Sequence, residues 1–151
     1  MKGKILRNDP VTFDEDRVYD QIVFIELSNG SILYLFDPDM ISTDKMVGKV
    51  KTLGIRAFIS RVEKLSAPKK GVESQYQSSD DTVRASKEPI TFFGEIIDIN
   101  KNEQDIFVDI GVDIIVVDLC WDERVLFGEY NNGDYVSIKP GRLDLFAVYD
   151  E

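Results

Sequence analysis

The sequence reads IVFIELSNGSILYLF at residues 22–36, two apolar runs joined by a Ser-Asn-Gly-Ser segment. Both runs are rich in β-branched and aromatic residues, which is typical of β-strands. Asn29-Gly30 supplies the positive φ angles that a two-residue hairpin turn requires. This turn predicts a register with one wholly apolar core face: Leu27 opposite Ile32, Ile25 opposite Tyr34, and Val23 opposite Phe36.

Short runs of the same kind recur along the chain. In the C-terminal part they cover residues 90–99, 105–110, 112–118, 135–138 and 143–149. Residues 121–126, WDERVL, are the best candidate for a short helix between the third and fourth of these runs. Asn132-Gly133 and Pro140-Gly141 mark turns. The chain is therefore predicted to be mainly β.

Residues 66–88 separate two stretches of strand-like sequence. This segment is rich in Ser, Gln and charged residues and has almost no apolar periodicity, so we expect a polar linker or long loop. The boundaries then give an N-terminal half at residues 1–65 and a C-terminal half at residues 89–151. The two halves either pack as one unit or move independently about the linker.

The two halves resemble each other. Gly3-Lys4-Ile5-Leu6 matches Gly94-Glu95-Ile96-Ile97, and Gly30 and Asp37 have the spacing of Gly111 and Asp118. Each half has the order strand, strand, strand, helical or irregular segment, strand, strand, which points to an internal repeat with chance similarity as the alternative. This order resembles an OB-fold, a five-stranded, partly open barrel. We expect two similar small barrel-like halves, with sandwiches and SH3-like barrels as alternatives.

The composition narrows the functional classes. Histidine is absent, which removes the residue most used for acid–base catalysis near neutral pH and most zinc chemistry. The single cysteine, Cys120, is flanked by acidic residues that disfavour its thiolate. One cysteine, no export signal and no apolar run of bilayer length favour a cytoplasmic location without membrane contact. We expect no cofactor, and a binding module rather than an enzyme.

Charge is unevenly distributed along the chain. Residues 1–65 carry ten basic and ten acidic residues, whereas residues 89–151 carry four basic and fourteen acidic residues. A negative field attracts basic partners and speeds their encounter. The sequence therefore predicts an adaptor whose acidic C-terminal half contacts a basic protein, with these candidate contacts: Asp105, Asp109, Asp113 and Trp121. Trp121 has a core position as its alternative interpretation.

Two further functions remain open. A three-residue loop at residues 110–112 would place Asp109 opposite Asp113, and like charges in that position call for a positive partner such as a divalent cation. This pair is the candidate metal site of a carboxylate- or metal-dependent hydrolase, with solvated carboxylates on an exposed face as the alternative. Single-stranded nucleic acid is a second possibility for the N-terminal half, in which basic residues and a stacking ring would form the contact: Lys49, Lys51, Arg56 and Phe24.

Overall fold

The computed structural model describes residues 1–74, 90–120, 122 and 128–149, and strands account for 62% of the described residues. The mainly-β prediction is therefore confirmed, and every strand expected in the C-terminal part is present. The strands are β1 (Lys2–Phe13), β2 (Val18–Leu27), β3 (Ile32–Asp37), β4 (Val50–Phe58), β5 (Arg61–Lys64), β6 (Gly71–Ser74), β7 (Ile90–Asn100), β8 (Asp105–Asp109), β9 (Ile114–Asp118), β10 (Tyr135–Lys139) and β11 (Arg142–Tyr149).

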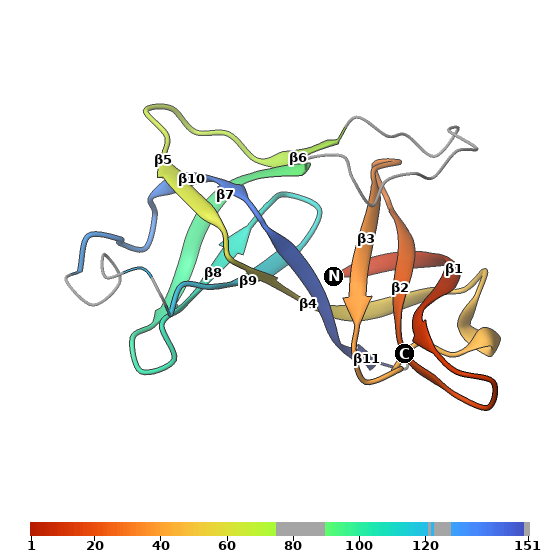
Figure 1. Ribbon diagram of the computed structural model, residues 1–151. Helices are drawn as coiled ribbons and strands as arrows, with labels where there is room; N and C mark the ends of the chain where they lie inside the picture. The colour runs from red at the N-terminus through yellow and green to blue at the C-terminus, as the bar shows by residue number, and fades with distance from the viewer. Residues whose placement is uncertain (75–89, 121, 123–127, 150–151) are drawn as a thin grey trace.

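Five of these strands close into a barrel. β1 pairs with β2, β2 with β3, and β4 returns to pair with the start of β1, all antiparallel. The ring is completed by β11, which lies between β3 and β4 although it comes from the end of the chain (Figure 1). The C-terminal strand is thus part of a barrel whose other strands all precede residue 59.

The outer strands continue from the far end of β4. There β4 pairs with β9 in parallel, and the order runs on through β8, β7 and β10 to β5. β5, the last strand in this order, pairs with β10 and follows β4 in the chain after a sharp bend at Ile59, whose φ is 53°. The main cluster of buried apolar residues runs through both parts, from Ile5 and Leu53 to Phe92 and Ile138, so the two parts share a continuous core.

The β2–β3 and β8–β9 hairpins each differ by one residue from the register expected from the sequence. In the β2–β3 hairpin Val23 lies opposite Leu35, and Leu33 and Leu35 rather than Tyr34 and Phe36 are fully buried. The reason is a three-residue loop in which Gly30 alone has positive φ, at 86°, a common alternative to the two-residue turn. In the β8–β9 hairpin the loop has four residues, so Asp109 lies opposite Ile114 and not opposite Asp113. A one-residue slip exchanges the two faces of a strand.

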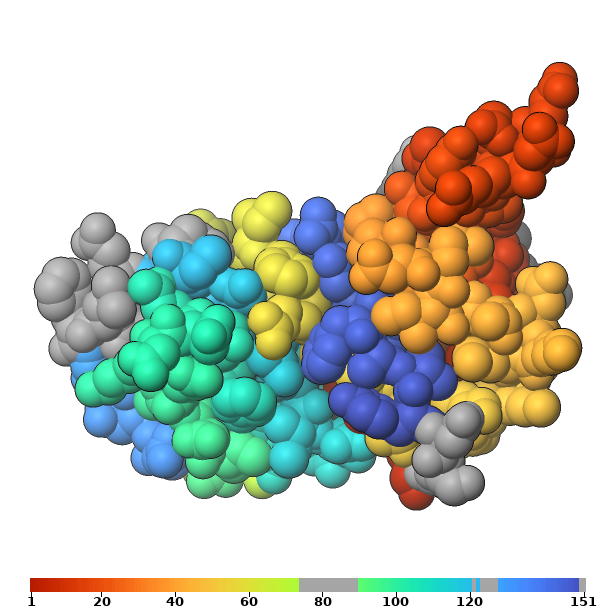
Figure 2. Space-filling view, turned by 90° about the horizontal axis from the view of Figure 1, so that it is seen from below, coloured from red at the N-terminus to blue at the C-terminus, as the bar shows by residue number. Residues whose placement is uncertain are grey.

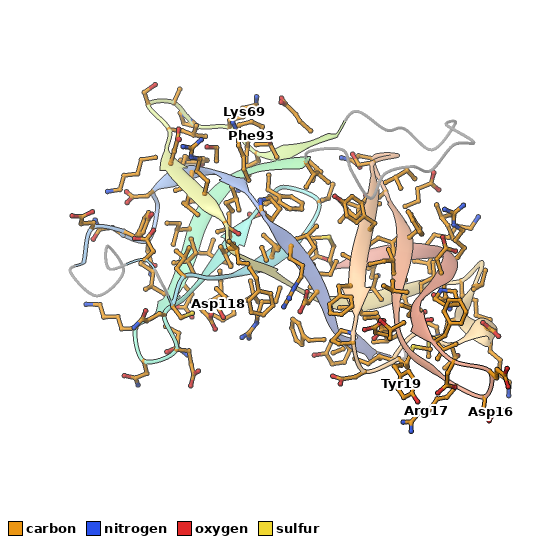
Figure 3. The ribbon with its side chains drawn as sticks, viewed as in Figure 1. Asp16, Arg17, Tyr19, Lys69, Phe93 and Asp118 are labelled. Carbon is orange, nitrogen blue, oxygen red and sulfur yellow. The ribbon has the colours of Figure 1, made fainter. Side chains whose placement is uncertain are left out.

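The segment predicted to be a linker begins as ordered structure. Residues 71–74 form β6, which pairs with β7, and Lys69 lies with its Nζ 3.8 Å from the ring centroid of Phe93 (Figure 3). Residues 75–88 of that segment lie outside the described residues, as does most of the helix candidate at 121–126. Helical structure in the described part is limited to the 3₁₀ turn Asp44–Met46, so the expected α-helix is not seen there. No described helix is long and apolar enough to cross a membrane.

Gly94 on β7 lies where the backbone of β8 comes close to it. A Cβ atom at this position would lie 2.6 Å from Val108 Cγ1 and would overlap the backbone oxygen of Asp109 on β8. We therefore predict that Gly94→Ala lowers the free energy of unfolding by about 3 kcal/mol, the upper part of the range for overpacking. Denaturant titration of the purified chain measures this difference.

Gly3→Ala is the matched control for this prediction. The two nearest atoms there are side-chain ends, Ile25 Cδ1 at 3.1 Å and Leu53 Cδ1 at 3.4 Å, and no backbone atom is among the three nearest. We expect a loss of less than about 1.5 kcal/mol. Equal losses in the two variants would show that the β7–β8 contact is not the tight one.

Candidate functional site

Carboxylates lie directly opposite each other at two places on the outer strands. Glu95 on β7 faces Asp109 on β8, and Asp105 on β8 faces Asp118 on β9. Like charges in this position destabilise a sheet unless something positive lies between them. In both places a cation from the first 70 residues of the chain is in contact with at least one of the two carboxylates.

Lys70 serves the first pair. Its Nζ donates a hydrogen bond to Asp109 Oδ2 at 2.8 Å and lies 3.5 Å from Glu95 Oε1. This hydrogen bond lowers the pKa of Asp109, and the same contact raises the pKa of Lys70. Lys70 therefore connects the segment before β6 to the β7–β8 hairpin.

Arg56 provides a positive charge for the second pair, Asp105 and Asp118, but at a longer distance. Its Nη2 lies 3.7 Å from Asp105 Oδ2, while Asp105 Oδ1 is buried and has no hydrogen-bond partner. Burial raises the pKa of Asp105, the neighbouring Asp118 raises it further, and Arg56 acts in the opposite direction. Cys120 belongs to the same cluster, and its thiol pKa is raised mainly by its hydrogen bond to Asp118, so the thiol is protonated at neutral pH and is a weak nucleophile.

Other acidic residues of the C-terminal part are also paired with early residues. The α-amino group of Met1 lies 3.4 Å from Asp113 Oδ2, and Lys64 Nζ lies 3.3 Å from Asp134 Oδ2. The three carboxylates predicted to contact a basic partner, Asp105, Asp109 and Asp113, thus each lie beside a cation of the same chain. The acidic C-terminal strands bind the N-terminal segment of this protein.

The candidate metal pair is divided between two cations. Asp109 is bonded to Lys70, and Asp113 lies in the β8–β9 loop beside the Met1 amine. In the described residues, no group of three or more acidic, Cys or His side chains is arranged to hold a metal ion. Trp121 lies outside the described residues.

The four residues of the nucleic-acid alternative lie in different places. Phe24 is only 3% exposed, and the Arg7 guanidinium covers its ring at 4.3 Å. Lys51 and Arg56 are five positions apart on β4. Because side chains alternate between the faces of a strand, the two point to opposite faces. Arg56 is engaged with Asp105 and lies 5.5 Å from the Phe146 ring centroid. Lys49 is exposed at the start of β4, so these residues do not line one groove.

A feature that the sequence interpretation missed is the far end of the β1–β2 hairpin. Residues 9–20, here called the arm, stand out from the body of the molecule (Figure 2). The arm exposes apolar side chains to an unusual degree: 65% of Phe13, 51% of Val11 and 46% of Tyr19. It also carries five acidic residues and one basic residue. Exposed apolar residues rimmed by charge are typical of protein-binding surfaces.

Asp14 organises the tip of the arm. Its Oδ1 accepts hydrogen bonds from the backbone N–H groups of Asp16 and Arg17, both at 3.0 Å, and its Oδ2 accepts one from the Tyr19 hydroxyl at 2.8 Å. Arg17 lies over the Tyr19 ring at 5.2 Å (Figure 3). The Tyr19 hydrogen bond is the largest cause of the lowered pKa of Asp14, and it raises the pKa of Tyr19. The exposed ring of Tyr19 is therefore held in place.

The opposite end of the same hairpin is hollowed and basic. A groove of about 500 Å³ lies where β1, β2 and β4 meet, and we call it the lysine groove. Its lining includes Lys2, Lys4, Glu26, Leu27, Ser28 and Val50. Lys49 precedes Val50, which is 60% exposed. In the described part of the chain neither Lys4 nor Lys49 makes an ion pair.

A signal for the arm was present in the sequence. Val11 and Phe13 precede the charged run Asp14-Glu15-Asp16-Arg17, and Tyr19 follows it, which fits a hairpin with a charged turn. Their exposure depends on the length of β1 and β2, which extend beyond the other strands of the barrel, and this is a property of the fold.

Comparison of the chain with known protein families, curated proteins and solved structures gives no match.

The pKa of Asp105 leads to a prediction about stability. Because burial raises this pKa above its ordinary value of 3.8, the ionised carboxylate disfavours folding at neutral pH. Asp105→Asn removes the charge, so we expect the variant to be more stable than the parent at neutral pH by about 1 kcal/mol. For a chain of this size that corresponds to about 2–4 °C in Tm. This gain in stability should shrink as the pH falls below the pKa of Asp105 in the folded protein.

Asp109→Asn is the control with the opposite sign. The hydrogen bond from Lys70 lowers the pKa of Asp109, so the carboxylate stabilises the fold above its ordinary pKa and this contribution is lost in acid. We expect Asp109→Asn to lower Tm at neutral pH and to match the parent at strongly acid pH. Thermal scans across this pH range measure the Tm of each variant relative to the parent. A Tm difference of the same sign in both variants at neutral pH would contradict this interpretation.

Proposed function

We propose that this protein is a non-catalytic binding module that captures a basic protein partner through the arm. The observation that carries the proposal is the exposure of Val11, Phe13 and Tyr19 on a projecting hairpin. Tyrosine and phenylalanine at such positions supply large contact areas, and aromatic residues are enriched in the centres of protein interfaces. The proposal keeps the predicted class of partner but moves the contact from the C-terminal strands to the arm.

The charge of the arm supports a basic partner. Asp9 forms an ion pair with Arg7, whereas Glu15 and Asp16 project from the exposed turn and have no basic partner in the described residues. The acids at Asp105, Asp109 and Asp113 lie beside cations of the same chain, whereas Glu15 and Asp16 on the arm are open to a second molecule. Such rim charges steer the encounter and select against acidic partners.

The fixed conformation of the arm's tip supports tight binding of a partner. Asp14 already fixes the turn and Tyr19 in the free protein, so less conformational freedom is lost on binding. A partner would meet Phe13 and Tyr19 close to their bound positions. This arrangement favours recognition by a rigid surface over folding on binding.

We also propose that the scaffold is a pair of OB-like barrels that exchange their fifth strands. Each ring of pairings contains three consecutive antiparallel strands, β1–β2–β3 or β7–β8–β9. The third strand of each ring meets a strand of the other half in parallel: β3 meets β11, and β9 meets the end of β4. The chain continues from β4 into β5, the fifth strand of the N-terminal half, which pairs with β10. The fourth strand of each ring, β4 or β10, returns to its first strand. This equivalence supports the internal repeat.

A photo-crosslinking amino acid in place of Phe13 tests the proposed contact. Expressed in the cells that naturally produce the protein, this variant should form discrete adducts when illuminated, and mass spectrometry should identify a component with a basic surface. Substituting Glu15→Gln and Asp16→Asn in the same chain should reduce the adducts several-fold, because these substitutions remove the complementary charge.

The same crosslinker at Ile97 is the matched control. Ile97 is 40% exposed on β7, far along the chain from the arm, so it tests general contact with an exposed apolar side chain. We expect no discrete adduct from this position. The proposal fails if position 13 gives no adduct, or if positions 13 and 97 give the same ones.

A further inference from the structure

We infer that the arm of one copy docks into the lysine groove of another copy, so that the chain assembles head to tail. This inference rests on the proposed function and names the partner as a second copy of the chain, whose lysine groove supplies the basic surface although the chain as a whole is acidic. It follows from two surfaces of one hairpin whose charge and polarity are complementary, one at each end of β1 and β2.

The two surfaces match in chemistry. The arm offers Phe13 and Tyr19 surrounded by five carboxylates. The groove offers the exposed Val50 beside Lys2 and Lys4, with one acid, Glu26, in its lining and Lys49 next to Val50 in the chain. The groove volume of about 500 Å³ falls in the range that accommodates small ligands and side-chain clusters. Docking would cover Phe13 and Val50, whose exposed fractions are 65% and 60%. It would also bring Lys4 and Lys49, which have no ion pair within the described residues, to the acids of the arm.

The contact has to be intermolecular. Lys4 and Phe13 are nine positions apart on β1, which is roughly 30 Å for an extended strand. β1 stays paired with β2 from Gly3 to Phe13, so the tip of the arm lies at the opposite end of the hairpin from its own groove. Since the arm and the groove are different surfaces, their contact is heterologous, and each added copy leaves one arm and one groove free.

Long-range repulsion between copies does not prevent this assembly at ordinary salt. The formal net charge of the chain is −10, so two copies repel each other when their charges are unscreened. At physiological ionic strength the screening length is about 8 Å, and the local contacts between acids and lysines then dominate over distant charges. Assembly is therefore expected to weaken when salt is reduced to very low levels.

Sedimentation velocity of three chains at physiological salt tests the inference. The parent chain should form species larger than a dimer as its concentration rises. The arm variant Phe13→Ser and the groove variant Lys4→Glu/Lys49→Glu should each lose self-association by at least tenfold. An equimolar mixture of the two variants should form a 1:1 dimer and nothing larger, because only one intact arm and one intact groove remain. Ile59→Ser, which changes a side chain that is 70% exposed elsewhere, should behave as the parent does.

Three outcomes would overturn the inference. The parent chain remains monomeric at several hundred micromolar; the mixed variants fail to form a dimer although each is folded by circular dichroism; or a labelled single-stranded oligonucleotide binds through Lys4 and Lys49 while the protein stays monomeric. A monomeric parent that still crosslinks to another protein through position 13 would remove this inference and leave the proposed function in place. If the parent chain is monomeric and position 13 also gives no adduct, both this inference and the proposed function fail.

Discussion

The central pairing of β4 with β11 connects all other parts of this fold. β11 runs antiparallel to β4 from Arg142 opposite Phe58 to Tyr149 opposite Thr52, and it also closes the barrel against β3. The far end of β4 meets β9 and leads into β5, so one long strand belongs to both sets of pairings. Removal of either strand would open the barrel and expose its core. The barrel in turn fixes β1 and β2, and the arm is their extension.

Charge reinforces this connection between the early and late parts of the chain. The excess of acid after residue 89 creates opposed carboxylates on β7, β8 and β9, which need positive partners. Lys70 and Arg56 supply them from the first part of the chain, and the Met1 amine does the same for Asp113. The carboxylates at Asp109 and Asp113 therefore favour the folded arrangement. The buried, incompletely satisfied Asp105 is the exception, and burial raises its pKa.

Much of the secondary structure could be predicted from local sequence, while the registers and the site could not. Runs of β-branched residues located the strands of the C-terminal part within a few residues, because strand propensity is a local property. The hairpin registers failed because Asn29-Gly30 and Ile110-Gly111 each fit more than one loop length, and a shift of one residue moves Asp113 off the strand. The partners of Asp109 and Asp113 are far away in sequence, so no local pattern identifies Lys70 or the Met1 amine. The exposure of Phe13 likewise depends on strands that end before the arm begins.

Backbone proton contacts across β11 test the central claim of this account most directly. In a nuclear Overhauser spectrum of the labelled chain, we expect contacts between Leu145 and Ile55 and between Asp144 and Phe36, as the pairing of β11 with β4 and β3 requires. Contacts from β11 to Val116 and Val117 on β9, with none to β4, would show instead that each half keeps its own last strand, and the account would then be wrong.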